Sequence, residues 1–286
     1  MAKGLEIKRR IRSIKSMLQV TKAMELIASI KMRKTQEAAL RSKTYVFESW
    51  RTIIRLARLE ENKNNPLLAT AKDGKVIALV IASDRGLAGS YNADILKKAL
   101  LLVKEYGLEN IDFMTMGKKA QDFIRKIGGN IVADFPLGQN VRFSFISPVA
   151  LIGWNGFVEG KYSRFISIHT HFESAAKHNA TQLQILPIDL SIIEEDKESL
   201  AHEFIFEPSK PEVLETIIRH TVRALTYQVI LESEAAEHAS RMIAMKNASD
   251  SAEDLKEDFE FTYNQIRQQA ITQELAEISA GSNALE

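Results

Sequence analysis

Two long stretches at the ends of this chain contain neither glycine nor proline. The first runs from Leu5 to Asn65, and the second begins after Pro211 and continues until Gly281. Glycine and proline are the residues that most often end helices and form turns, and both stretches are longer than the about 8–20 residues of an ordinary globular helix. The pattern therefore predicts one long helix at each end of the chain, as in coiled coils.

The first of these stretches predicts a helix over residues 3–58, roughly 80 Å long at 1.5 Å per residue. One apolar stripe has the spacing of a heptad repeat and consists of Ile7, Ile11, Ile14 and Leu18. A second stripe consists of Met17, Val20, Met24 and Ile27. A surface helix has one apolar stripe, whereas the segment MLQVTKAMELIASIKM (17–32) is apolar on nearly all sides. We therefore expect it to be covered from more than one side.

The second stretch begins with a helix-start signal. Ser209 and Glu212 have the spacing of a capping box, and Pro211 falls in the first turn. The following helix is predicted to run to the end of the chain. Its apolar residues alternate spacings of three and four, as in a coiled-coil seam: Met245, Ala248, Ala252, Leu255, Phe259, Thr262 and Ile266.

The charges of the two ends are opposite. Residues 1–58 contain 15 Lys and Arg against 4 Asp and Glu, whereas residues 209–286 contain 7 against 14. Opposite charges favour pairing of the two helices, and a compact domain between them makes that pair antiparallel. A DNA-binding coiled coil would also be long and basic, but its basic region would be more polar than 17–32. A mitochondrial transit peptide is also basic, but it would end before a helix of this length.

The middle of the chain alternates strand-like and helix-like segments. KVIALVIAS (75–83) is a continuous apolar run, which is typical of a parallel strand buried on both faces. The order is βαβαβ, then a helix and a pair of strands, which predicts an open, doubly wound sheet. The fold class is therefore α/β: a long antiparallel coiled coil of N- and C-terminal helices (1–60 and 209–286) plus a central Rossmann-like α/β domain (74–190).

The turn ASDRGLAGSYN (82–92) is the first candidate for a chemical site, because ligands of α/β sheets bind where a strand leads into a helix. It matches neither GxGxxG nor GxxxxGK[ST], and it has no lysine to reach a phosphate. We interpret it as a tight turn in which Ser83 or Asp84 binds backbone donors. The alternative is an α/β small-molecule-binding enzyme with a coiled-coil oligomerisation arm, centred on residues 83–92.

Two other groups could serve chemistry. His169, His171 and His178, with Glu173, could bind a metal, but a solvated strand face is the simpler interpretation. The acidic run at 194–198, with Glu194, Glu195, Asp196 and Glu198, is interpreted as a solvated linker. The chain has no cysteine, which excludes disulfides, thiolate metal ligands and cysteine nucleophiles. No catalytic residue, cofactor or metal site is therefore predicted.

Several segments resemble one family over nearly the whole chain. IRSIKSMLQVTKAMELIASIKMRKTQ (11–36) and ITQELAEISAGSNA (271–284) are similar to the two signature ends of the gamma subunit of F-type ATP synthases. ASDRGLAGSYN resembles the central turn of that family, and RMIAMKNASDSAEDL (241–255) resembles its C-terminal helix. Residues 138–162 carry no such resemblance.

The resemblance implies a central rotor stalk that couples proton flow to ATP synthesis. Its coiled coil would enter a ring of three alpha and three beta subunits, and its α/β domain would contact the epsilon subunit and the c-ring. Nucleotides and catalysis would belong to the alpha and beta subunits. The protein would be a peripheral membrane protein on the cytoplasmic face of the bacterial plasma membrane.

The resemblance also implies contact residues on both helices. Lys22 and Met24 match positions that face the acidic lever of beta, although Met24 could instead be a coiled-coil core residue. Arg267 and Gln268 match positions that bond to a loop of beta, although Arg267 could be a solvated charge. Thr272 and Glu274 belong to the same signature.

Overall fold

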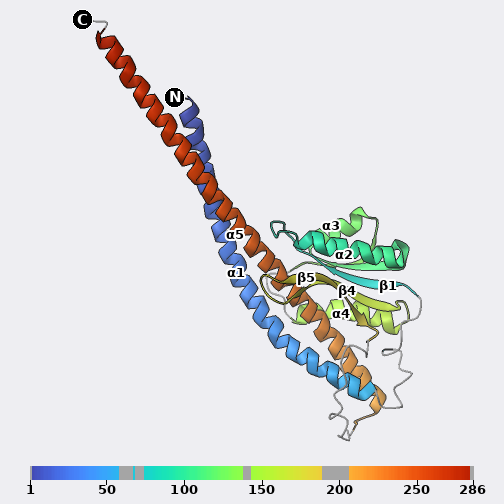
Figure 1. Ribbon diagram of the computed structural model, residues 1–286. Helices are drawn as coiled ribbons and strands as arrows, with labels where there is room; N and C mark the ends of the chain where they lie inside the picture. Colours follow the sequence, from blue (N-terminus) through green and yellow to red (C-terminus); the bar gives the residue numbers. More distant parts are fainter. Residues whose placement is uncertain (1, 58–66, 68–73, 138–142, 189–205, 284–286) are drawn as a thin grey trace. The chain divides into compact units, whose positions relative to one another are not determined.

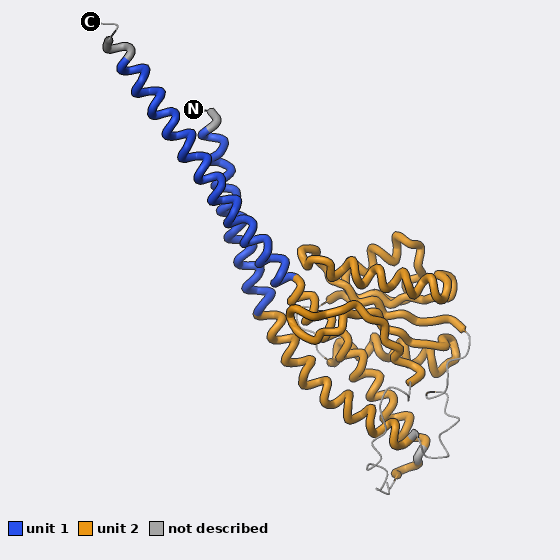
Figure 2. Tube along the Cα trace, viewed as in Figure 1, with its two compact units in different colours: residues 1–29, 241–286 blue, residues 30–240 orange. Residues whose placement is uncertain are grey.

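The computed structural model describes residues 2–57, 67, 74–137, 143–188 and 206–283. The chain forms two compact units (Figure 2). One consists of residues 1–29 and 241–286, and the other of residues 30–240. We describe each unit separately, and we call residues 2–29 together with 241–283 the helical arm.

The two long helices predicted from the sequence are confirmed. Helix α1 covers Ala2–Ala57 and helix α5 covers Lys210–Asn283 (Figure 1). Helix α5 starts at the predicted signal, where the Ser209 hydroxyl donates a hydrogen bond of 3.0 Å to the Glu212 carboxylate. Both helices contribute to both units, so each has two different environments along its length.

The second unit is built on a five-stranded sheet in the order β3-β2-β1-β4-β5. Its strands are β1 (Val76–Ile81), β2 (Ile111–Met116), β3 (Asn130–Phe135), β4 (Arg164–Phe172) and β5 (His178–Leu186). The first four are parallel, and β5 is antiparallel to β4. The order reverses between β1 and β4, which makes this a doubly wound sheet, as predicted.

Helices cover both faces of the sheet. Helices α2 (Tyr91–Tyr106) and α3 (Lys118–Lys126) pack on one face, and α4 (Phe143–Val158) packs with α5 and the end of α1 on the other (Figure 1). The residues of β1 are buried at all six positions, because alternate side chains enter the cores on opposite faces. This confirms the prediction of a strand covered on both sides.

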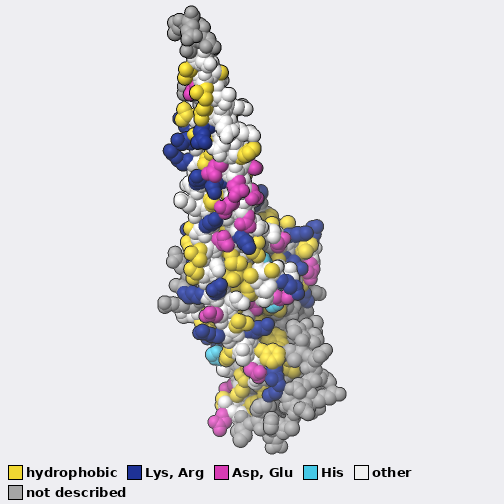
Figure 3. Space-filling model, turned by 60° about the vertical axis from the view of Figure 1, so that its left-hand side comes forward, with side chains coloured by type: hydrophobic (Ala, Val, Ile, Leu, Met, Phe, Trp, Pro, Cys, Tyr) yellow, Lys and Arg dark blue, Asp and Glu magenta, His cyan; other side chains and the backbone are white. Residues whose placement is uncertain are grey.

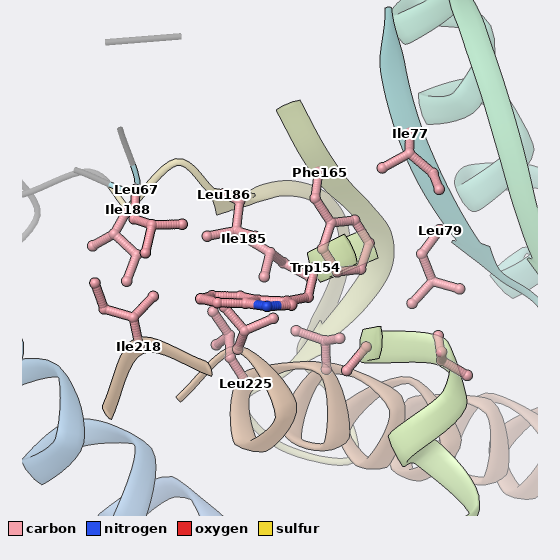
Figure 4. Packing of buried hydrophobic residues seen from close by; sticks show 14 of the residues in the cluster. Leu67, Ile77, Leu79, Trp154, Phe165, Ile185, Leu186, Ile188, Ile218 and Leu225 are labelled. Carbon is pink, nitrogen blue, oxygen red and sulfur yellow. The ribbon is translucent and has the colours of Figure 1, made fainter. Parts of the chain in front are cut away.

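The core under α4 and α5 is centred on aromatic side chains. Trp154 of α4 lies against Phe165 of β4 and near Leu225 of α5 (Figure 4). Trp154 is only 2% exposed and Phe165 is fully buried. Residues 221–240 of α5 are all buried or half-buried, because the sheet and neighbouring helices surround this part of the helix. Residues 221–240 of α5 therefore form part of the core of the second unit.

Candidate functional site

The two helices of the arm form an antiparallel coiled coil. Ile7 and Ile11 of α1 are buried, as are Met245 and Ala252 of α5, in agreement with the predicted seams. At one level of the seam the Ser249 hydroxyl donates a hydrogen bond of 2.8 Å to the Thr21 hydroxyl. Both of these residues are buried, so the arm contains a polar layer within its apolar contact.

The predicted seam of α5 consists of two rows of residues, and only one of them is correct. The row of Met245, Ala252, Phe259 and Ile266 is buried or half-buried, whereas Leu255 and Thr262 of the other row are not. Leu255 is 51% exposed and Thr262 is exposed, while Ser249 is 2% exposed and the Lys256 side chain is 24% exposed. The second row of contact residues therefore contains Ser249 and Lys256, each one position after a residue of the predicted row. The error arose because hydrophobicity was used to choose the row, whereas here a serine and the aliphatic stem of a lysine line the contact and a leucine faces outward.

The second apolar stripe of α1 is largely left uncovered by α5. Met17, Val20 and Ile27 are 57%, 55% and 55% exposed, and only Met24 of that stripe is half-buried. Single exposed apolar residues are common, but a contiguous apolar patch indicates an interaction site. The outward side of residues 17–27 is thus a candidate protein contact.

A second uncovered apolar stripe lies towards the end of α5. Ile271, Leu275 and Ile278 are 48%, 62% and 68% exposed. Spacings of four and three place them on one side of the helix. Figure 3 shows apolar, basic and acidic side chains on one face of the arm, with charges of each sign gathered in clusters. The sequence prediction missed this stripe, although its spacing alone could have revealed it.

Lys22 and Met24 both lie on α1 within the stretch 17–27, but they have different environments. The Lys22 ammonium lies 3.1 Å from the Glu253 carboxylate of α5, and the Lys22 side chain is 55% exposed. Met24 is half-buried beside the seam, and its contact with the lever of beta stays a prediction. Glu253 was not identified from the sequence.

The other four predicted contact residues lie further along α5. Arg267, Gln268, Thr272 and Glu274 are all exposed. The Thr272 hydroxyl donates a hydrogen bond of 2.9 Å to the Gln268 carbonyl, while the amide and charged groups of the set face solvent. Arg267 lies 14 positions beyond Glu253, which is about 21 Å along a helix. The predicted residues therefore form two separate groups on the arm, near Lys22 and near Arg267.

The turn after β1 uses its polar groups internally. Ser83 is buried, and both its backbone N–H and its hydroxyl donate hydrogen bonds to the Asn92 side-chain oxygen, at 3.0 and 2.9 Å. Asp84 accepts a hydrogen bond of 3.0 Å from the backbone N–H of Lys118. This confirms the interpretation as a tight turn, since Asp84 binds a backbone N–H group and the Ser83 hydroxyl is bonded to the Asn92 side chain within the same turn.

The predicted solvated strand face is wrong for His169, whereas the His171 side chain on the same strand is 44% exposed. His169 is 3% exposed, because β4 lies inside the sheet and α5 packs on its face. His171 forms a 2.6 Å contact with the Glu232 carboxylate, and His178 contacts the Ser240 hydroxyl at 2.7 Å. The Ser167 hydroxyl lies 3.1 Å from Nδ1 of His169, so each histidine has its own partner. The described residues contain no group of three or more potential metal-binding side chains.

The buried His169 is expected to make the stability of the protein depend on pH. Burial lowers its pKa from 6.5 to about 4, so the unfolded state binds more protons than the folded state between these values. The free energy of unfolding is unaffected by this histidine above about pH 6.5. It decreases by about 3 kcal/mol as the pH drops to 4, because His169 must remain neutral in the folded state. In urea titrations between pH 4 and 7, His169→Asn should remove this part of the loss, while His220→Asn, at an exposed site of α5, should retain it.

The predicted acidic run at 194–198 lies outside the described residues. Among those described, no helix has the length and apolar character needed to cross a membrane.

Comparisons with known proteins relate the whole chain to one family. A family model described as ATP synthase matches residues 3–285. The chain is 35% identical to the ATP synthase gamma chain of Legionella pneumophila strain Corby over the full length of both. It is also 35% identical to that of Heliobacterium modesticaldum over 98% of each chain.

Solved structures share the fold. A central stalk chain of the Tetrahymena thermophila mitochondrial ATP synthase superposes with a TM-score of 0.62 at 24% identity, covering 80% of this chain and 99% of that one. A chain of the Euglena gracilis mitochondrial ATP synthase superposes with a TM-score of 0.67 at 19% identity, covering 99% and 95%.

Proposed function

Because the chain belongs to the family of ATP synthase gamma chains, we propose that it is the central rotor stalk of an F-type ATP synthase and couples proton flow to ATP synthesis. It is a non-catalytic subunit, and the reaction takes place on beta subunits. Its partners are three alpha and three beta subunits, an epsilon subunit and the c-ring. It acts as a peripheral subunit on the cytoplasmic face of a bacterial plasma membrane.

The observation that carries this proposal is the uncovered apolar surface of the arm. Met17, Val20 and Ile27 on α1 and the stripe ending at Ile278 on α5 are more than half exposed, except for Ile271 at 48%. Such side chains are stabilised when a partner removes them from water. A ring of subunits around the arm would cover both stripes, which lie on different helices.

The arm also has unlike sides, which a rotor requires. The exposed basic residues of α1 include Lys8, Arg9 and Arg12, and the exposed acidic residues of α5 include Asp250, Asp254, Glu257 and Asp258. A bound partner shifts a conformational equilibrium only through its different affinities for the two states. A turning arm with unlike sides presents a different surface to each beta subunit in turn, and so favours a different state in each.

Purification with alpha and beta subunits tests this function. The expected result is a cofractionating assembly that hydrolyses ATP. A chain that remains monodisperse and separate from alpha and beta subunits would contradict it. The enzyme alternative, by contrast, requires nucleotide or substrate binding by the isolated chain, and the internal hydrogen bonds of Ser83 and Asp84 give it no support.

Charge reversal at Arg267 should weaken the contact near the end of the arm. Arg267 is exposed on α5, so Arg267→Glu should leave the folding of the chain unchanged. Loss of a hydrogen bond from a charged group costs about 1.5–3 kcal/mol, so we expect at least a tenfold weaker affinity for the ring or a matching loss of coupling. Unchanged ATP synthesis and hydrolysis in the assembled variant would remove Arg267 from the contact.

A further inference from the structure

A recess of about 250 Å³ lies in the second unit, where α1, β4 and α5 meet. All of its lining residues belong to the unit of residues 30–240. Pockets for drug-sized ligands begin at about 300 Å³, so this recess suits a ligand smaller than a nucleotide. The lining residues that decide its chemistry are Leu40, Lys43, His171, Phe172, Gln228 and Glu232.

The side chain of Gln228 is the unusual feature of the recess. It is only 5% exposed, and its amide nitrogen donates a hydrogen bond of 2.8 Å to the Glu232 carboxylate. This bond fixes the orientation of the amide, whose carbonyl oxygen is buried and has no hydrogen-bond donor among the described residues. Buried polar groups in proteins are nearly always satisfied. Because Gln228 lines the recess, a donor bound there can satisfy this oxygen.

Glu232 places a negative charge one helical turn from Gln228. Its side chain is only 11% exposed. One carboxylate oxygen accepts the hydrogen bond from Gln228, and the other lies 2.6 Å from Nδ1 of His171. Each carboxylate oxygen can accept a second hydrogen bond, so Glu232 retains acceptor capacity. The carboxylate and the unsatisfied amide oxygen thus form an acceptor pair on one side of α5.

This acceptor pair selects a cation that carries several N–H donors. Glu232 would repel an anion, and the described part of the chain offers no group of three or more metal-binding side chains. A guanidinium group has five N–H donors in a rigid planar fork and is more weakly hydrated than an ammonium group. It can therefore donate to Glu232 and to Gln228 at the same time.

The walls of the recess suit the rest of such a ligand. Ala39, Leu40 and Phe172 line it and would cover the aliphatic carbons that carry a guanidinium group. Lys43 is exposed and is the one lysine or arginine among the described residues that line the recess. Its ammonium group favours a ligand that also carries a carboxylate, as the free amino acid arginine does.

We propose that the recess between α1, β4 and α5 binds the guanidinium group of an arginine, with Glu232 and Gln228 as its acceptors. The arginine is either the free amino acid or a side chain of a neighbouring subunit, since both present the same group. This inference goes beyond the proposed rotor function and does not depend on it, because the site lies within this chain alone.

Calorimetric titration of the full chain with L-arginine tests the site, and L-citrulline is the matched control probe. Citrulline has the same length and the same amino-acid end, but an uncharged urea group replaces the guanidinium. Hydrogen bonds that involve a charged group are the stronger ones, so arginine should bind at least about tenfold more tightly than citrulline. Equal binding of the two probes, or no binding of arginine, would overturn the inference.

Two substitutions locate the site. Glu232→Gln should lower the affinity for arginine at least about tenfold, and Gln228→Met should lower it roughly two- to tenfold. Methionine adapts well to such a position, so Gln228→Met should unfold in denaturant like the original chain. The control is Glu215→Gln, which makes the same change of charge at an exposed position of α5 and should leave the affinity unchanged. Undiminished binding by either site variant would contradict the assignment.

Assembly with alpha, beta and epsilon subunits distinguishes the two sources of the arginine. If the assembled chain binds free arginine as the isolated chain does, the ligand is the small molecule. If assembly abolishes this binding, a side chain of a neighbouring subunit occupies the recess, and Glu232→Gln should then weaken assembly. Failure of the unaltered chain to assemble would overturn the proposed function, whereas failure to discriminate arginine from citrulline overturns this site.

Discussion

Replacement of Ile271, Leu275 and Ile278 together by glutamine is expected to lower the affinity of the chain for the subunit ring by at least about a hundredfold. Complete burial of such a side chain contributes about 1.5–3 kcal/mol. These three are 48–68% exposed in the free chain, so about 1 kcal/mol or more is lost at each position. The three losses together amount to about 3 kcal/mol, which corresponds to an affinity at least about a hundredfold lower.

The isolated variant should be as stable as the original chain, because these side chains make few contacts within the arm and glutamine is a good helix former. Leu100→Gln/Leu101→Gln is a suitable control, since both leucines are exposed on α2 of the other unit. Sedimentation or titration with alpha and beta subunits measures the effect. Equal affinities of the triple glutamine variant and the original chain would show that the ring does not cover this stripe.

Gly117→Ala is expected to have the largest effect on stability. Gly117 follows β2 with a φ of +87°, and a Cβ atom there would lie 2.0 Å from the Ala82 carbonyl oxygen. The backbone conformation is strained for any other residue, and a backbone oxygen cannot move away as a flexible side chain can. We expect a loss of about 4 kcal/mol or more in denaturant unfolding.

Gly86→Ala provides the matched control in the neighbouring turn. A Cβ atom at Gly86 meets nothing within 4 Å, so the same substitution should change stability by no more than about 0.5 kcal/mol. If Gly117→Ala were equally mild, the two chain segments after β1 and β2 would not lie as close together as the structure shows.

The long helices could be predicted from the sequence because their signals are local. Breaker-free stretches and the capping pair Ser209 and Glu212 do not depend on what lies far away in the chain. The strands were equally clear where both faces are buried, as in β1. The family resemblance at both ends of the chain then identified the function, which the fold by itself does not specify.

Side-chain roles within the arm were harder to predict because they depend on the partner helix. The outward position of Leu255 and the buried position of Ser249 follow from the pairing with Thr21 on α1. The Glu253 partner of Lys22 lies 231 positions away in the chain. His169 was misplaced for the same reason, since only the packing of α5 on β4 shows that the strand face is covered.

Rotation of the chain within the assembled ring tests the central claim most directly. The chain has no cysteine, so Lys104→Cys, at an exposed position of α2, would provide a unique attachment point for a visible probe. With the ring of alpha and beta subunits fixed to a surface, ATP hydrolysis should turn the probe in one direction. A probe that stays still while the same assembly hydrolyses ATP would contradict the account of this chain as a rotor.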